Sequence, residues 1–195
     1  MTIAFVLGNG ISRREIVPTQ LQLLGKIYGC NGLYREFTPD VLVATDRPIA
    51  TAIQQSGYAK TNRFHTRRPL PDLGAQAVPH DYFGYSSGPI AVSLAAADQH
   101  KRIYLLGFDL GPTTTQGFNN IYAGTQFYKA TNAAPTYTGN WIKQMCRVMR
   151  DHAHTKFYRV CGETSAPIAE LSALPNLFTV DLLVFVDRIN NQKDL

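Results

Sequence analysis

Short apolar runs alternate with stretches of helical length along most of the chain. Seven runs rich in β-branched and aromatic residues predict strands at residues 3–8, 26–30, 40–46, 61–66, 102–109, 155–162 and 177–186. The stretches between them predict helices at about 12–24, 47–56, 88–100, 140–153 and 165–174. Runs such as IYLLGF (103–108) are apolar throughout, as in strands that are buried on both faces. The pattern predicts an α/β, Rossmann-like fold with a mostly parallel sheet flanked by helices.

The chain of 195 residues fits one domain, so we expect residues 1–195 to form a single α/β unit. Residues 110–138, after the fifth predicted strand, interrupt the alternation with a segment rich in Thr, Asn, Gly and Tyr. This segment is too long for a plain connection and too aromatic for a disordered linker. Such segments often cover a ligand, so we interpret 110–138 as a lid.

Composition and cysteine content indicate the environment in which we expect the protein to work. Hydrophobic residues make up 45% of the chain and charged residues 17%, as in an ordinary globular protein. No apolar run approaches 18 residues, and the first residues lack the pattern of a signal peptide, so we expect no membrane span. The three cysteines form no CxxC pair, which favours reduced thiols and a cytoplasmic location.

The formal net charge is +5, and the densest basic cluster is residues 59–69, which contain Lys60, Arg63, Arg67 and Arg68. A solvated basic loop is the simpler interpretation, and a site for phosphate groups is the alternative. No motif of a nucleic-acid-binding module accompanies the cluster. We therefore expect a small anionic ligand and no nucleic acid.

Polar and small residues recur where the predicted strands end. In open α/β sheets, ligands bind at the carboxyl ends of the strands, so these residues should converge. The candidate binding residues are Gly8, Asn9, Gly10, Asn31, Asp46, Ser87, Gly88 and Asp109. Each of the asparagines and aspartates could instead satisfy a turn of the backbone.

The first turn, GNGIS (8–12), predicts a nucleotide site of an unusual kind. Gly8 and Gly10 would permit tight or left-handed backbone geometry, and the following helix would offer free N–H groups to a phosphate. Ser12, with Glu15 three residues later, fits a capping box at the start of that helix. Arg13 stands where a dinucleotide fingerprint has its third glycine, which argues against an NAD site.

Other catalytic chemistries have weaker signals. The chain contains neither a GxSxG nor a GxxxxGK[ST] motif, and its histidines lack a ligand spacing. His152 and His154 are two residues apart, which does not suit a shared helical face. We therefore predict no metal site.

Several stretches occur in an order that resembles a known family. They are GNGIS, CNGLY, SSGPIAVSLAAA, IYLLGFD and KFYRVCGETSAPIAELSALPNL. Together they resemble the small bacterial sialyltransferases, which use CMP-sialic acid without a metal. The resemblance covers residues 3 to about 178 and implies a donor nucleotide held by Asn9, Gly10, Asn31, Ser87 and Gly88. It also implies glycosyl transfer without a further cofactor, and a homotetramer.

The same resemblance assigns catalytic positions in the lid. Tyr122, in NNIYAGT, matches a tyrosine that contacts the donor phosphate in the family. Thr136 occupies the place of the family's general-base histidine, and a threonine hydroxyl cannot act as a base near neutral pH. Tyr137 is the neighbouring alternative, although its phenol would need a strongly lowered pKa. The sequence therefore leaves open whether the protein is catalytically active.

A second resemblance leads to a different activity. PDVLVATD and the stretch ending in YLLGFDL are similar to the archaeal-type hydroxymethylpterin pyrophosphokinase-like family. That resemblance implies pyrophosphate transfer from a nucleotide, with Mg²⁺ near Asp46 and Asp109. A third possibility is a protein that binds a nucleotide without catalysis.

Overall fold

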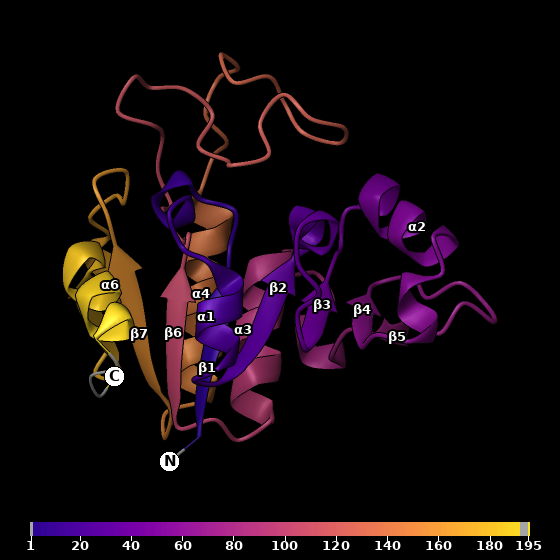
Figure 1. The fold of residues 1–195 in the computed structure, drawn as a ribbon, viewed down its shortest axis with the longest axis horizontal. Coiled ribbons are helices and arrows are strands. Elements are labelled where there is room, and N and C mark those ends of the chain that lie inside the picture. Colours follow the sequence, from indigo (N-terminus) through magenta and orange to yellow (C-terminus); the bar gives the residue numbers. More distant parts are fainter. Residues whose placement is uncertain (1, 192–194) are drawn as a thin grey trace.

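The computed structural model describes residues 2–191 and 195. In this part of the chain one open sheet of eight parallel strands has the order β5-β4-β3-β2-β1-β6-β7-β8 (Figure 1). The strands are β1 Ile3–Leu7, β2 Lys26–Cys30, β3 Val41–Val43, β4 Phe64–Thr66, β5 Gln76–Ala77, β6 Arg102–Leu106, β7 Lys156–Cys161 and β8 Leu177–Asp181. The predicted α/β, Rossmann-like fold is confirmed.

Helices connect the strands. The α-helices are α1 Pro18–Gln22, α2 Arg47–Gln55, α3 Ser87–Ala97, α4 Gly139–Asp151, α5 Ala169–Ser172 and α6 Leu182–Asn190. Four short 3₁₀ helices are η1 Ile11–Arg13, η2 Asn31–Arg35, η3 Tyr58–Lys60 and η4 His80–Tyr82. Among the described residues, no helix has the length and apolar character needed to cross a membrane.

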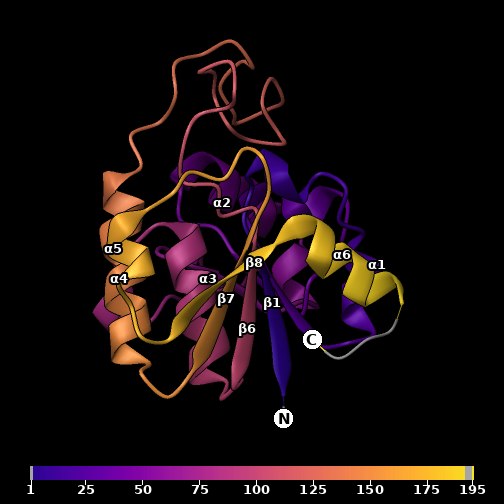
Figure 2. The same ribbon diagram turned by 90° about the vertical axis from the view of Figure 1, so that its left-hand side faces the viewer.

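The helices form a layer on each face of the sheet (Figure 2). Along β1, Ala4 and Val6 point to the core beneath α3, α4 and α5, whereas Phe5 and Leu7 point to the core beneath α1, α2 and α6. This alternation follows from the two-residue period of a strand. Because both faces are covered, the inner strands are apolar throughout, which explains the runs in the sequence.

Residues 177–186 are not one strand, which corrects the prediction. β8 ends at Asp181, whose carboxylate accepts hydrogen bonds from the N–H groups of Leu183 (2.9 Å) and Val184 (3.1 Å) and so begins α6. Phe185 is fully buried in the core beneath α6. A short apolar run fits a strand and a buried helix equally well, and the cap decides between them here.

Other boundaries also differ from the prediction. The helix expected at 12–24 is broken into η1 and α1, with Pro18 at the start of α1. The helix expected at 165–174 is reduced to Ala169–Ser172, and β5 was not predicted. The lid therefore follows the sixth strand, β6. It contains no helix or strand and rises above the carboxyl ends of the sheet (Figures 1 and 2).

A buried arginine holds the chain where it leaves β6. Arg159, on β7, donates hydrogen bonds to the carbonyl oxygens of Phe108 (2.9 Å), Asp109 (2.8 Å) and Ala166 (2.8 Å). Its side chain is 5% exposed. Three backbone acceptors satisfy the guanidinium where water cannot reach it. The start of the lid and the loop after β7 are thereby fixed to each other.

A polar cluster lies at the opposite, amino end of the sheet. The Tyr28 hydroxyl donates a hydrogen bond to Asp98 (2.6 Å), and Arg63 forms an ion pair with the same carboxylate (2.6 Å). His100 lies 3.1 Å from the Tyr28 hydroxyl through Nε2. Burial lowers the pKa of both His65 and His100. These histidines are therefore neutral in the folded protein at pH 7.

Replacing Asp181 with Ala should destabilise the protein by about 1 kcal/mol, because two N–H groups at the start of α6 lose their acceptor. Urea unfolding followed by circular dichroism would measure this loss. Glu15→Ala removes an exposed carboxylate elsewhere and serves as the control. An Asp181→Ala variant as stable as the control would contradict the capping role.

The free energy of unfolding should decrease as the pH falls from 7.5 to 5.5. Unfolded histidines bind protons near pH 6.5, whereas His65 and His100 resist protonation in the fold because burial lowers their pKa. Asp98 titrates below this window because its pKa is also lowered, so it does not contribute. Urea unfolding at several pH values would measure the slope. A double His65→Gln, His100→Gln variant should have a smaller slope, and an unchanged slope would contradict this explanation.

Candidate functional site

A cavity of about 410 Å³ lies at the carboxyl ends of the central strands, beneath the lid. We call it the lid cavity. All eight binding residues predicted from the sequence line it: Gly8, Asn9, Gly10, Asn31, Asp46, Ser87, Gly88 and Asp109. The convergence expected from the strand ends is therefore present. Thr136 also lines this cavity, whereas Tyr122 and Tyr137 do not.

The turn after β1 has glycines because it packs against the loop after β6. A Cβ on Gly10 would lie 2.6 Å from Cγ of Asp109, and one on Gly8 would lie 2.6 Å from the carbonyl oxygen of Gly107. Gly10 has φ −65°, so its backbone is not left-handed. The expectation of left-handed geometry is wrong here, and close approach of two backbones is the reason for the glycines.

The N–H groups of this turn are occupied by the protein itself. Gly10 donates to the carbonyl oxygen of Gly107 (2.8 Å), Ile11 to the side chain of Asn119 (2.8 Å) and Ser12 to Asp109 (3.0 Å). The helix that follows is the single 3₁₀ turn η1. The predicted phosphate site at this helix start is therefore not available.

Asp109 is the acceptor that joins three loops. Its carboxylate accepts hydrogen bonds from the N–H and the hydroxyl of Ser12, from Thr164 (2.8 Å) and from Ser165 (3.2 Å). Asp109 is 2% exposed. Ser12 therefore does not form the predicted capping box with Glu15, because its hydroxyl is directed to Asp109.

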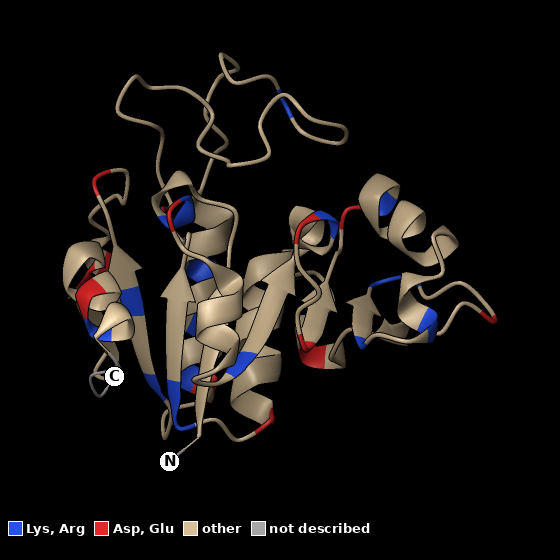
Figure 3. Ribbon diagram, viewed as in Figure 1, with Lys and Arg blue, Asp and Glu red and all other residues tan. Residues whose placement is uncertain are grey.

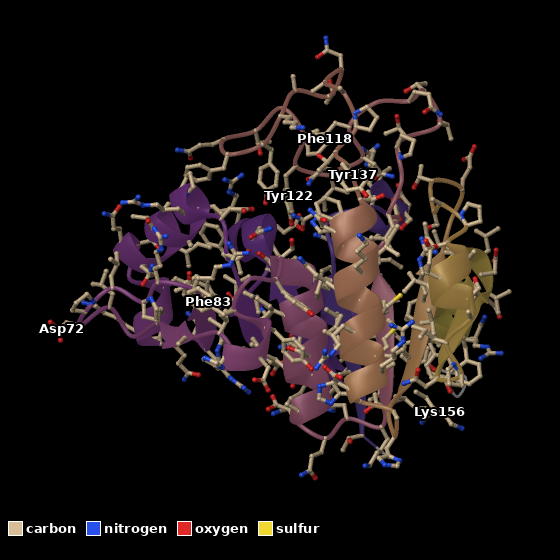
Figure 4. All side chains as sticks on the ribbon, turned by 180° about the vertical axis from the view of Figure 1, so that it is seen from behind. Asp72, Phe83, Phe118, Tyr122, Tyr137 and Lys156 are labelled. Carbon is tan, nitrogen blue, oxygen red and sulfur yellow. The ribbon has the colours of Figure 1, made fainter. Side chains whose placement is uncertain are left out.

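Arg13, at the position of the missing glycine, is buried beneath the turn. Its Nε donates to the carbonyl oxygen of Gly8, and its Nη2 donates to the Tyr122 hydroxyl (2.9 Å). The Tyr122 hydroxyl in turn donates to Glu36. Tyr122 is 8% exposed, and Figure 4 shows it between the lid and the body of the protein. Tyr122 therefore connects the lid to the body and lies outside the cavity.

Tyr128 is the lid tyrosine that lines the cavity, and the sequence analysis missed it. Its hydroxyl accepts hydrogen bonds from Nδ2 of Asn9 (3.3 Å) and from the N–H of Gly32 (2.8 Å). Burial raises its pKa to about 12, so the phenol is protonated at pH 7. The rings of Tyr122 and Tyr128 are adjacent, with centroids 5.4 Å apart. Tyr122 thus supports Tyr128.

The two asparagines offer unused hydrogen-bonding groups. Asn31 has φ +48°, a left-handed conformation that asparagine tolerates better than most residues. Its Oδ1 accepts a hydrogen bond from the Ser87 hydroxyl (2.9 Å), and among the described residues its Nδ2 has no acceptor. Oδ1 of Asn9 is buried and, within the described chain, has no donor. Both residues line the lid cavity.

The start of α3 is the remaining helix terminus at the cavity. Ser86 precedes the helix, and its side chain makes no capping hydrogen bond. The N–H groups of Ser87 and Gly88 are in the first turn, where a helix has no internal acceptor for them. This end of an eleven-residue helix can bind an anion.

The lid contributes further groups. Lys129 lines the cavity, and its ammonium lies 5.7 Å from the centroid of the Phe118 ring. Trp141, at the start of α4, also lines it. Tyr137 is 74% exposed, so it does not share the site with Thr136 (Figure 4). Neither Lys129, in the lid, nor Trp141, on α4, was among the sequence candidates.

The basic residues of 59–69 do not form one patch. Arg63 precedes β4 and pairs with Asp98 at the amino end of the sheet, whereas Arg67 and Arg68 follow β4 at the carboxyl end. Figure 3 shows the Lys and Arg positions in the region of β4 as separate segments of the ribbon. The strand therefore divides the cluster, which corrects the interpretation of a single basic loop.

Among residues 2–191 and 195, no group of three or more His, Cys, Asp and Glu side chains is arranged to hold a metal ion. Asp46 and Asp109 both line the cavity, but the Asp109 carboxylate is already occupied by donors from Ser12, Thr164 and Ser165. Its capacity for a cation bridging phosphates is correspondingly reduced.

The chain is an open, all-parallel Rossmann-like protein with a cavity at the carboxyl edge of the sheet. A solved structure with a related fold is the sialyltransferase CST-II in complex with a trisaccharide acceptor and CMP. It shares 15% sequence identity and a TM-score of 0.51, with 86% of this chain and 89% of that chain covered. A mutant of the α-2,3/8-sialyltransferase CstII also matches, with 15% identity, a TM-score of 0.49 and coverages of 86% and 90%.

The likeness to the complex with CMP shows that the chain has a sialyltransferase-like fold. No family model matches the sequence, and no curated protein is similar to it. The structural matches named here do not support the resemblance to the pterin pyrophosphokinase-like family, which stays a hypothesis.

Asp109→Asn should destabilise the protein by about 2–3 kcal/mol, because each carboxylate oxygen accepts from two donors and the amide replaces one of these oxygens with an NH₂ group. Urea unfolding with and without Mg²⁺ would measure the loss. Asp46→Asn is the control, since Asp46 is exposed and takes part in none of the ion pairs found among the described residues. Equal stability of the two variants, or a loss seen only with Mg²⁺, would contradict the structural role.

Proposed function

We propose that this protein is a glycosyltransferase that uses a CMP-type nucleotide-sugar donor, with the nucleotide bound in the lid cavity. The observation that carries the proposal is the set of unused hydrogen-bonding groups from separate strands that line one cavity under a lid. A sialyltransferase-like fold supports this choice of donor class. Sialic acid is the sugar that the resemblance favours.

The lid cavity offers hydrogen-bond donors, an acceptor and positive charge to the donor nucleotide. The first-turn N–H groups of α3 and the ammonium of Lys129 suit the phosphate, because both present positive charge to it. Nδ2 of Asn31 is a free donor and Oδ1 of Asn9 is a free acceptor. Together these two groups suit a ribose hydroxyl or the edge of a base.

Tyr128 would stabilise the leaving group. Both lone pairs of its hydroxyl accept hydrogen bonds, from Asn9 and from Gly32, so its own proton is free to be donated. A raised pKa keeps that proton in place at pH 7. Donation to a phosphate oxygen would stabilise the charge that develops as the bond between the sugar and the phosphate breaks.

The acceptor hydroxyl must lose a proton during transfer. The Thr136 hydroxyl lines the lid cavity but cannot take that proton near neutral pH. Tyr137 lies outside the cavity. Asp46 lines the cavity with an exposed carboxylate that pairs with no described cation, so it is the group we assign to this step.

A nucleotide-binding protein without catalysis is the second candidate. The specific observation in its favour is Thr136 at the position where the resembling family has its base histidine. The two candidates differ in turnover: both require CMP to bind, and only the first requires release of CMP from CMP-sialic acid when an acceptor is present.

Tyr128→Phe should lower the rate of CMP release from CMP-sialic acid by about 100-fold, because it removes the donor to the leaving phosphate. A coupled assay with and without acceptor would measure the rate in the absence of Mg²⁺. Tyr158→Phe, on β7 outside the cavity, is the matched control. Asn31→Ala should weaken CMP binding about tenfold in calorimetry, since one good hydrogen bond is lost.

Two results would contradict the proposed function. One is the absence of CMP binding at millimolar concentration. The other is a Tyr128→Phe rate equal to that of Tyr158→Phe. CMP binding without any turnover across acceptors would favour the non-catalytic candidate.

A further inference from the structure

A second cavity of about 300 Å³ lies beside the lid cavity. We call it the arginine cavity, because Arg47, Arg67 and Arg68 line it. It runs along one face of α2, and Phe83 is on its lining. Asp46 lines both cavities, so they meet at this residue. A molecule in the arginine cavity would therefore share Asp46 as a neighbour with one in the lid cavity.

The three arginines lack acidic partners. None of the ion pairs among the described residues includes Arg47, Arg67 or Arg68. Other arginines of the same chain are paired with carboxylates, for example Arg63 with Asp98 and Arg147 with Asp151. Three unpaired guanidinium groups on one cavity, against the single carboxylate of Asp46, leave a net positive site.

Arg47 is in an unfavourable position for stability. It is the first residue of α2; Asp46 precedes it as the N-cap without a capping hydrogen bond, and no acidic residue lies in the first turn. A cation at a helix N-terminus is repelled by the positive end of the helix dipole. A residue in a locally unfavourable position, such as a cation at a helix N-terminus, often has a role in binding a ligand. An anion in the arginine cavity would compensate both the charge of Arg47 and the positive end of the helix dipole.

The opposite wall is held in place by hydrogen bonds. Arg67 donates from Nη2 to the carbonyl oxygens of Gly84 (3.2 Å) and Tyr85 (2.8 Å), and its Nε is buried without an acceptor among the described residues. Gln54, which is 1% exposed, donates to the carbonyl oxygen of Arg68 (3.3 Å) and accepts from the N–H of Leu70 (2.7 Å). These contacts fix the backbone that presents Arg67 and Arg68.

We propose that the arginine cavity binds the acceptor of the transfer reaction, and that this acceptor is a sugar carrying a carboxylate or a phosphate. This inference rests on the proposed function. Guanidinium groups bind both anions through paired N–H donors. The half-exposed ring of Phe83 offers an apolar face to the sugar. Carboxylate and phosphate share this chemistry, and the experiment separates them.

The position of Asp46 then has a chemical reason. A carboxylate within a cationic site opposes anion binding, yet Asp46 lies where the acceptor would meet the donor. The acceptor oxygen forms a bond to the anomeric carbon as the bond from that carbon to the phosphate oxygen breaks. The electron pair of the broken bond leaves with CMP, and the hydroxyl proton goes to the Asp46 carboxylate.

The test uses three sugars of the same skeleton: glucose, glucuronate and glucose 6-phosphate. Calorimetry and ¹⁵N-detected NMR would measure the binding of each to the full chain without a donor. We expect one or both anionic sugars to bind and to perturb signals of Arg67 and Thr51, with no binding of glucose. Binding should weaken as salt rises. The anion that binds identifies the class of acceptor.

Single variants test the assignment to residues. Arg47→Ala and Arg68→Ala should each weaken anion binding about tenfold, because each removes one charge-assisted contact. Neither should change CMP affinity. Arg150→Ala, which removes an exposed arginine on α4, is the matched control. Arg47→Ala should have a melting temperature equal to or above that of the parent, so a folding defect would not explain its weaker binding.

The outcomes distinguish this inference from the proposed function. CMP binding without any preference for anionic sugars over glucose would overturn the inference and leave the proposed function standing. Equal losses in Arg68→Ala and Arg150→Ala would also overturn it. Anion binding at Arg67 and Arg68 without CMP binding would overturn the proposed function, and the acceptor role with it.

Discussion

The carboxylate of Asp109 is the group on which the arrangement of the site depends. A charge that is 2% exposed is costly unless donors surround it, and here the donors come from Ser12, Thr164 and Ser165. These residues follow β1 and β7, whereas Asp109 follows β6. One buried anion therefore fixes three loops at the carboxyl edge of the sheet. The Ser12 N–H is thereby bonded within the protein, and the start of α3 is the helix terminus at the cavity whose first-turn N–H groups have no internal acceptor.

The lid depends on cations from the body of the protein. It has no helix or strand, so its backbone gains no order from regular hydrogen bonding. Arg35, on η2, donates to the carbonyl oxygen of Gln126 (2.9 Å), and its guanidinium lies 5.7 Å from the centroid of the Phe127 ring and 5.8 Å from that of Tyr128. Arg13 holds Tyr122 from below. These two arginines, together with the hydrogen bonds from Asn9 and Gly32 to its hydroxyl, hold Tyr128 over the cavity.

The sheet, and the convergence of eight candidate residues on one cavity, were predictable because both follow from local rules. Periodicity identifies strands, and parallel topology brings their carboxyl ends to one edge. The choice between Tyr122 and Tyr128 was not predictable in this way. It depends on a hydrogen bond between Asn9 and Tyr128, which are 119 positions apart, within a segment without periodicity. The prediction of a single basic loop at 59–69 was wrong for a related reason. β4 lies in the middle of this stretch, so the arginines on either side of it lie at opposite ends of the sheet.

Arg13 also explains why a dinucleotide would not fit the first turn. The third glycine of the dinucleotide fingerprint serves the close packing of a helix on its strand, and η1 is only one turn long. Here the side chain of Arg13 fills that space, and a Cβ on Gly107 would lie 3.0 Å from its Cγ and Cδ. Gly107 has φ +71°, so the two positions constrain each other. A turn filled from below by an arginine, with its N–H groups already bonded, can border a nucleotide but cannot bind a pyrophosphate as a dinucleotide fold does.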